Sequence, residues 1–132
     1  MMKKILLLSD THSFLDPRIL GYAKEVDEIW HAGDIGNLEV TDTLQKLKPL
    51  RAVYGNIDNA SIRQEFPKDL HFQLEGVSVF MTHIGARPTR YAKGIAEKLT
   101  DVKPQLFICG HSHILKVAYD KKKELLYINQ KN

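Results

Sequence analysis

The sequence contains little that would support a disulfide-bonded or membrane-spanning architecture. Cys109 is the single cysteine among 132 residues, so an intramolecular disulfide is excluded and nothing indicates an oxidising compartment. No apolar run approaches the ~20 residues that a membrane-spanning helix needs. The apolar stretch at residues 5–9 follows two lysines, but it is too short for a signal peptide and lacks a cleavage site. These absences predict a cytoplasmic protein with no membrane partner.

Charge of either sign is also modest. The formal net charge is +3, and the chain lacks the basic stripe that a nucleic-acid-binding surface requires, so a nucleic-acid polymer is a disfavoured partner. The lysine run 121–123 lies between Asp120 and Glu124 and is better explained as a solvated hairpin turn than as a phosphate-binding loop. The length and the 43% hydrophobic content predict one globular domain over residues 1–132.

Short apolar runs alternate with amphipathic segments, which is typical of an α/β fold. Residues 3–10 predict a strand buried on both faces, because their apolar residues are continuous. Asp16 and Pro17 predict a helix cap and first position, opening a helix to about Lys24. The other expected elements are strands over 27–34, 50–56 and 105–111, helices over 40–47 and 91–99, a hairpin over 71–83 that turns at Glu75 and Gly76, and a hairpin over 115–129.

Polar side chains follow most of the predicted strands. In open α/β sheets, ligands gather at the carboxyl ends of the strands. Any one such residue has an ordinary explanation as a helix cap, a turn residue or a surface histidine, but here five separate segments supply them. The seven residues are Asp10, His12, Asp34, Asn56, His83, His111 and His113.

These seven side chains offer carboxylate, imidazole and amide oxygen atoms without a thiolate. That mixture suits Mn²⁺, Fe²⁺, Zn²⁺ or Ni²⁺ better than an all-oxygen Ca²⁺ site or a sulfur site. Seven ligands exceed the needs of one tetrahedral ion, whereas two ions ~3.5–4 Å apart, bridged by a carboxylate, would use them all. We therefore expect two divalent metal ions, with Mn²⁺ favoured and Ni²⁺, Zn²⁺ and Fe²⁺ as alternatives.

The motifs DTH, GD, GNID, TH and GHSH, which run in this order from Asp10 to His113, resemble those of the calcineurin-like metallophosphoesterase superfamily. The short length is similar to that of its small bacterial and archaeal phosphodiesterase branch. The resemblance implies a four-layer α-β-β-α sandwich of two mixed β-sheets, here without the family's final C-terminal strands. It also implies a hydrolase that cleaves small phosphodiesters, in which a metal-bridging hydroxide attacks phosphorus.

The resemblance also implies a role for each motif residue. The first ion would be held by Asp10, His12 and His113, the second by Asn56, His83 and His111, and Asp34 would bridge both. Asp34, Asn56 and His83 are therefore also the expected catalytic residues. Because residues two apart in an extended segment point the same way, His111 and His113 can face one pocket. Glycines at 33, 55 and 110 would let the backbone approach the centre closely.

Two segments depart from the family pattern, the GNID motif and the stretch HIGARPTRY that begins at His83. Many relatives have a histidine after the motif asparagine that protonates the leaving oxygen, but this chain has Ile57. Since such protonation raises the rate by ~10²–10⁴-fold, we expect lower activity on esters with poor leaving groups. We also expect Asp58 to take part in loop hydrogen bonds.

Arg87 and Arg90 follow His83 and are the expected substrate contacts, because a guanidinium can bind phosphate bidentately. The alternative is that both are ordinary surface arginines.

Two other functions stay open at this point. A non-catalytic binding scaffold is one, since a eukaryotic coat-complex subunit shares the fold with an eroded metal site. In that case ligands should be missing, yet all seven are present here. A nuclease acting on polymers is the other, but it would need a basic stripe. The absent final strands would leave a sheet edge unpaired, which predicts a homodimer or larger assembly that ultracentrifugation can test.

Overall fold

The structure of the chain is a computed structural model that describes residues 4–87, 90–91, 94–110, 116–121 and 125–129. Its helices are α1 (Pro17–Ala23), α2 (Leu38–Leu47), α3 (Ala60–Glu65) and α4 (Ile95–Val102). Its strands are β1 (Ile5–Leu8), β2 (Glu28–His31), β3 (Leu50–Ala52), β4 (Asp69–Leu74), β5 (Val77–Thr82), β6 (Ala86–Arg87), β7 (Arg90–Tyr91), β8 (Leu106–Cys109), β9 (Lys116–Asp120) and β10 (Leu125–Asn129). Within the described residues, none of the helices has the length and apolar character that crossing a membrane would require.

The first sheet consists of β1, β2 and β3, which are parallel and lie in that order. Leu8 pairs with His31, and His31 pairs with Ala52, so the three strands end at the same level. The loops that follow them therefore leave from one edge of the sheet. This register positions the candidate site, because polar residues follow each of these strands.

The second sheet has the order β4-β5-β8-β10-β9 and is mixed. Strands β5, β8 and β10 are parallel, while β4 and β9 pair antiparallel at the two ends. Glu75 and Gly76 have φ values of 51° and 79°, as expected for the tight turns that connect hairpins. The predicted hairpin turn between β4 and β5 is therefore confirmed.

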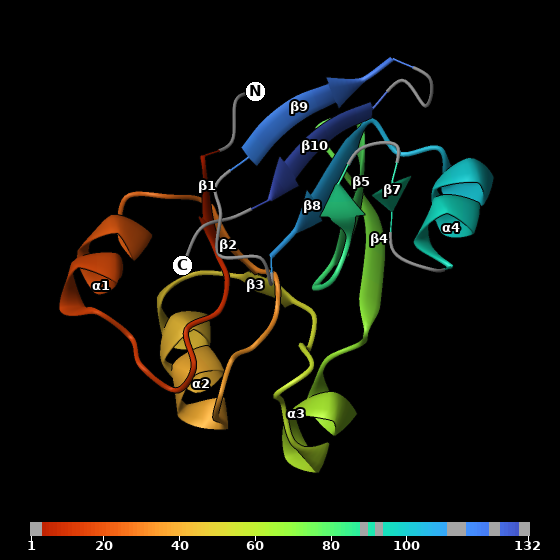
Figure 1. Ribbon diagram of the computed structural model, residues 1–132. Helices are drawn as coiled ribbons and strands as arrows, with labels where there is room; N and C mark the ends of the chain where they lie inside the picture. Colours follow the sequence, from red (N-terminus) through yellow and green to blue (C-terminus); the bar gives the residue numbers. More distant parts are fainter. Residues whose placement is uncertain (1–3, 88–89, 92–93, 111–115, 122–124, 130–132) are drawn as a thin grey trace.

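Three apolar clusters separate four layers of secondary structure. The first packs α1, α2 and α3 against the first sheet, and it includes Leu8, Ala23 and Leu44. The second lies between the two sheets and contains Trp30 and Met81. A third packs α4 onto the outer face of the second sheet, so that α1 and α4 lie on opposite sides of the molecule (Figure 1). The predicted four-layer α/β sandwich is confirmed.

The layering explains why residues 3–10 are continuously apolar. Leu6 and Leu8 pack in the cluster between the first sheet and the helices, whereas Ile5 and Leu7 pack in the cluster between the sheets. Successive side chains of a strand point to opposite faces, and both faces of β1 are covered. Such a strand needs apolar residues at every position.

Two local predictions differ from the structure. The helix expected over 91–99 begins at Ile95, and its N-cap residue, Gly94, has φ 83°, a left-handed conformation that suits glycine and does not continue a helix. Tyr91 instead pairs with Ala86 in the β6–β7 hairpin. Helix α3 was not predicted, since six residues show too little periodicity. Its sequence signal was Asn59, whose side-chain oxygen accepts from the N–H of Ile62 at 3.1 Å, a typical N-cap.

Candidate metal centre

Two aspartates follow the first two strands of the parallel sheet. Asp10 and Asp34 are each only 2% exposed. The N–H of Asp10 donates to the carbonyl oxygen of Gly33 at 2.9 Å, and the N–H of His12 donates to that of Asp34 at 3.0 Å. Asp10, His12 and Asp34 have φ values of 55°, 48° and 56°, in the left-handed region that side chains other than glycine rarely adopt. Backbone strain of this kind clusters at functional sites.

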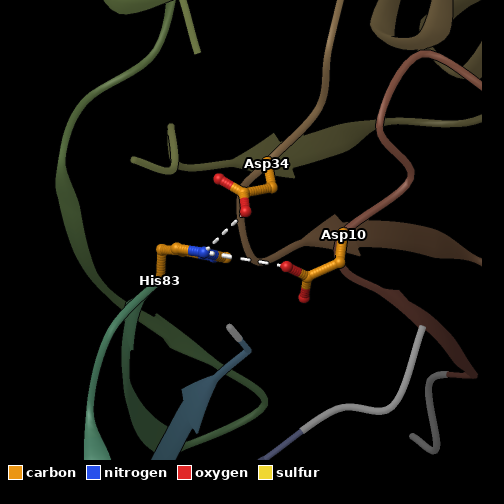
Figure 2. Close-up of side chains that lie close together, drawn as sticks. All are labelled: Asp10, Asp34 and His83. Atoms are coloured by element: carbon orange, nitrogen blue, oxygen red, sulfur yellow. Dashed lines mark ion pairs between the residues drawn. The ribbon is translucent and has the colours of Figure 1, made fainter. Parts of the chain in front are cut away.

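In each of the two carboxylates, one oxygen accepts a hydrogen bond from a neighbouring residue and the other oxygen faces His83. Asp34 accepts from the N–H of Ile57 through Oδ1 at 3.1 Å, and Asp10 accepts from the hydroxyl of Ser9 through Oδ2. The remaining oxygens face His83, whose Nε2 lies 3.7 Å from Asp10 Oδ1 and 3.2 Å from Asp34 Oδ2 (Figure 2). The two carboxylates therefore converge on one point from neighbouring loops.

The ring of His83 has a defined tautomer. His83 follows β5 and is 2% exposed, and its Nδ1 lies 2.8 Å from the carbonyl oxygen of Ala32. A carbonyl can only accept a hydrogen bond, so Nδ1 carries the proton. In the neutral ring, Nε2 then directs its lone pair toward the carboxylates, as metal-ligating histidines do when the other nitrogen donates to a backbone carbonyl.

His12 places a second imidazole beside the same carboxylates. Its Nε2 lies 3.8 Å from Asp10 Oδ1 and 3.5 Å from Asp34 Oδ2, and its side chain is 43% exposed. Within the described residues, the two aspartates therefore lie between a buried imidazole, His83, and a partly exposed one, His12.

The donor set fits a divalent metal ion. Asp10, Asp34 and His83 each offer one ligand atom, and these three atoms lie within 4.8 Å of one another. Two buried carboxylates at this separation are costly unless a positive charge or a proton compensates them. Oxygen and imidazole nitrogen donors without sulfur are the combination that Mn²⁺, Fe²⁺, Zn²⁺ and Ni²⁺ accept.

Asp58 holds the loops that follow β2 and β3 together. Its carboxylate accepts from three backbone N–H groups: Ile35 at 3.1 Å, Gly36 at 2.9 Å and Gly55 at 2.8 Å. The residue is 3% exposed, so these bonds satisfy donors that would otherwise be buried without partners. The contacts agree with the predicted role of Asp58 in loop hydrogen bonds.

His31 links the loops that carry Asp10 and Asp34. It ends β2 and is fully buried, and its Nδ1 accepts from the N–H of Gly33 at 3.1 Å. The neutral ring therefore carries its proton on Nε2, which donates to the hydroxyl oxygen of Thr11 at 3.0 Å. That hydroxyl donates in turn to the carbonyl of Ile35 at 2.9 Å. Sequence analysis missed His31, although its place at the end of β2 beside Ile29 and Trp30, which are buried, was a signal.

Burial lowers the pKa of His31 from 6.5 to about 4, which makes stability depend on pH. The unfolded chain binds a proton on this ring near pH 6.5, whereas the folded chain does not until about pH 4. We therefore expect the free energy of unfolding to fall as the pH drops through this window, by up to about 3 kcal/mol. Urea denaturation of the wild type and His31→Gln between pH 7 and pH 4.5 measures this difference. Equal pH dependence in the two proteins would contradict the prediction.

The end of β8 also lies at the site. The N–H of Gly110 donates to the carbonyl of His83 at 2.9 Å. A Cβ added at Gly110 would lie 2.9 Å from Asp10 Oδ2 and 1.9 Å from Ser9 Oγ. Only glycine permits this approach, so the strand that leads toward the GHSH motif can reach the buried aspartates.

The structure places the predicted site residues in two groups. Four of them lie together at the two aspartates. Asn56 lies apart from these four, on the exposed loop after β3, and lines a cavity that His83 also lines. The role of Asn56 as a ligand stays a prediction. The residues that come together are Asp10, His12, Asp34 and His83.

The remaining predicted residues cannot be placed at the site by their side chains. His111 and His113 lie outside the described residues. Arg87 and Arg90 pair with each other in the β6–β7 hairpin, and their side chains also lie outside the described part of the chain. The predicted ligand and substrate contacts of these four residues therefore stay predictions.

Cys109 takes no part in this chemistry. It is fully buried, and burial raises the pKa of its thiol to about 11. A thiol with such a pKa remains protonated near neutral pH, whereas nucleophilic cysteines are thiolates. The single cysteine is therefore a core residue.

The fold and the site together define an α/β protein whose carboxylates and histidines converge at the ends of its strands. Residues 2–130 match the family of calcineurin-like phosphoesterase superfamily domains. The chain therefore belongs to this family, and the resemblance of its five motifs is confirmed.

Three proteins are similar to this chain, one by sequence and two by structure. A probable metallophosphoesterase of Methanothermobacter thermautotrophicus is 26% identical over 112 residues, which cover 81% of this chain and 64% of that protein. An archaeal phosphodiesterase matches with a TM-score of 0.72 at 24% identity, covering 98% of this chain and 84% of that one. Vps29 of Entamoeba histolytica, solved as a complex with Zn²⁺, matches with a TM-score of 0.74 at 17% identity, covering 97% and 73%.

Proposed function

We propose that the protein is a metal-dependent phosphodiesterase acting on small phosphodiesters. One observation carries the proposal: ligand atoms of two buried aspartates and a buried histidine lie within 4.8 Å of one another in a chain of the calcineurin-like phosphoesterase family. The archaeal phosphodiesterase with the same fold supports a diester as the substrate. The overall reaction adds water across one P–O bond, so that the products are a phosphomonoester and an alcohol.

We further propose two divalent ions, with Mn²⁺ favoured, as the cofactors. When bound, such ions supply an activated water and neutralise charge on the phosphoryl oxygens. The residues proposed to hold them are Asp10, His12, Asp34, Asn56, His83, His111 and His113. The protein's own contribution is positioning: Ile57 and Ser9 each anchor one carboxylate oxygen, and the Ala32 carbonyl orients the His83 ring.

The leaving group must depart without a side-chain acid at position 57. The backbone N–H of Ile57 contacts Asp34, so this residue lies next to the centre, but its side chain is 47% exposed and cannot donate a proton. We therefore propose that the enzyme prefers diesters whose alcohol leaves readily. A nitrophenolate leaving group meets this requirement because it departs without protonation.

The experiment that tests the proposal is hydrolysis of bis(p-nitrophenyl) phosphate and of p-nitrophenyl phosphate. The purified protein is stripped of metal with EDTA and then supplied with Mn²⁺, Ni²⁺, Zn²⁺ or Fe²⁺. Turnover of the diester that is restored by one ion and exceeds monoester turnover is expected. Absence of turnover with every ion would refute the proposal and favour the binding scaffold, the second candidate, whose fold the Vps29 relative shares.

Three broader predictions remain part of the proposal. They are a single domain over residues 1–132, a cytoplasmic location and a homodimer formed through a sheet edge. In the described residues β1 pairs on one side only, with β2, and an exposed edge strand can pair with another chain. A monomer in sedimentation velocity would exclude the dimer.

A further inference from the structure

A cavity of about 360 Å³ lies beside the candidate metal centre. His83 and Asn56 form part of its wall, so the cavity adjoins the site at which the phosphorus would bind. Arg63 and Lys68 also line it, together with Tyr54. None of its described lining residues is acidic. The cavity therefore combines contact with the centre and an excess of positive charge.

The second cavity near the site has the opposite character. It measures about 530 Å³, and its lining residues include Asp10 and Asp16. Among its described lining residues Arg18 is the one cation, and it is bound to Asp16 with an N–O distance of 2.8 Å. Its acidic lining residues, Asp10 and Asp16, outnumber this one cation, which disfavours an anionic group there. Of these two spaces, the smaller cavity is the one whose charge favours an anion.

The guanidinium of Arg63 is held in a defined orientation at this cavity. Its Nε donates to the carbonyl of Asp58 at 2.8 Å and one terminal nitrogen donates to that of Asn56 at 3.3 Å. Its central carbon lies 4.7 Å from the centre of the Tyr54 ring. A guanidinium has five N–H donors, so donors beyond these two contacts remain for a ligand. A positively charged group that is already oriented loses little entropy on binding an anion.

Neither cation of the cavity is neutralised within the described part of the chain. Arg63 and Lys68 are exposed, and the ion pairs between described residues join other partners, such as Arg51 to Glu28 and Lys98 to Asp69. Two uncompensated cations on one wall attract an anion more strongly than either cation alone.

We infer that this cavity binds a second anionic group of the substrate, carried by the alcohol that stays esterified to phosphorus. The inference rests on the proposed phosphodiesterase activity, because the metal centre would hold the phosphodiester itself. The substrate class is then a diester with an additional carboxylate or phosphate. Ile84 and Ile95 also line the cavity, so a short apolar spacer between the phosphodiester and the second anion fits its wall.

A pair of synthetic esters tests the inference. Both carry the same p-nitrophenyl leaving group, and the second alcohol is either butyl or 3-carboxypropyl, which differ mainly in one negative charge. We expect the wild type to have a kcat/KM about tenfold higher for the carboxypropyl ester, as one charge-assisted contact would produce. Lys68→Gln should lower this ratio severalfold, and Lys68→Glu should bring it below one. Lys68 is the better target because Arg63 also holds the loop carbonyls.

The control is Lys46→Gln, which removes a lysine on the exposed face of α2 and should leave the ratio unchanged. A wild-type ratio near one, or a ratio that neither Lys68 variant alters, overturns the inference. Isothermal titration of both esters in the presence of Mn²⁺ gives a readout that does not need turnover. The carboxypropyl ester could bind more tightly than the butyl ester, and Lys68→Glu could abolish this difference, while neither ester is hydrolysed. This result would support the anion site and overturn the proposed activity.

Discussion

Asp34→Asn is expected to lower diester hydrolysis by at least about 10²-fold, the loss typical when one electrostatic contact of a transition state is removed. Asp34 Oδ2 lies 3.2 Å from His83 Nε2 and 3.5 Å from His12 Nε2, so its charge lies at the point where the ligands converge. An asparagine keeps the shape, and its carbonyl oxygen can still accept from Ile57. The fold should therefore persist. The measurements are kcat/KM with saturating Mn²⁺ and the circular dichroism spectrum.

A second readout separates metal binding from chemistry. Mn²⁺ should raise the melting temperature of the wild type, because an ion that binds the folded state and not the unfolded state stabilises the folded state. Asp34→Asn should show a much smaller rise. The matched control is Asp42→Asn, the same chemical change at an exposed position on α2. Undiminished turnover in Asp34→Asn would refute the proposed bridging role.

Gly55→Ala is expected to disrupt both the centre and the fold. A Cβ at this position would lie 2.1 Å from Asp34 Oδ1 and 2.3 Å from the Asp34 backbone nitrogen, closer than atoms can approach. The loop after β3 or the Asp34 loop must therefore move. Since the N–H of Gly55 also donates to Asp58 at 2.8 Å, movement would weaken a buried hydrogen bond. We expect a loss of about 1–3 kcal/mol in the free energy of unfolding.

The same substitution at Gly21 provides the control. Gly21 lies within α1, and a Cβ there would have no atom within 4 Å. Alanine favours a helix over glycine by about 1 kcal/mol, so Gly21→Ala should stabilise the chain slightly and leave Mn²⁺ binding unchanged. Urea denaturation and Mn²⁺ titration of both variants measure the contrast. Wild-type stability and metal affinity in Gly55→Ala would show that the loops at Asp34 can accommodate the methyl group.

Local sequence patterns predicted the elements that have a strong periodic or turn signal. The strand at residues 3–10 was predicted from its continuous apolar residues, which the structure buries on both faces. Helix α1 was predicted from Asp16 and Pro17, which act as cap and first helical residue. The prediction of helix positions failed where the local sequence signal was weak. Six residues of α3 are too few for periodicity, and α4 begins after Gly94, whose left-handed conformation a periodic pattern does not reveal.

The sequence by itself determined the family of this protein and the donor atoms available for its proposed metal site, which are the oxygens and nitrogens of ordered aspartates and histidines without a thiolate. Residue type is a local property, so it can be read directly from the chain. Only the tertiary structure decided which oxygen of each aspartate faces His83, that His31 bridges two loops, and that Arg63 and Lys68 share a cavity with Asn56. These arrangements arise from packing between segments distant in the chain, and no local pattern encodes them.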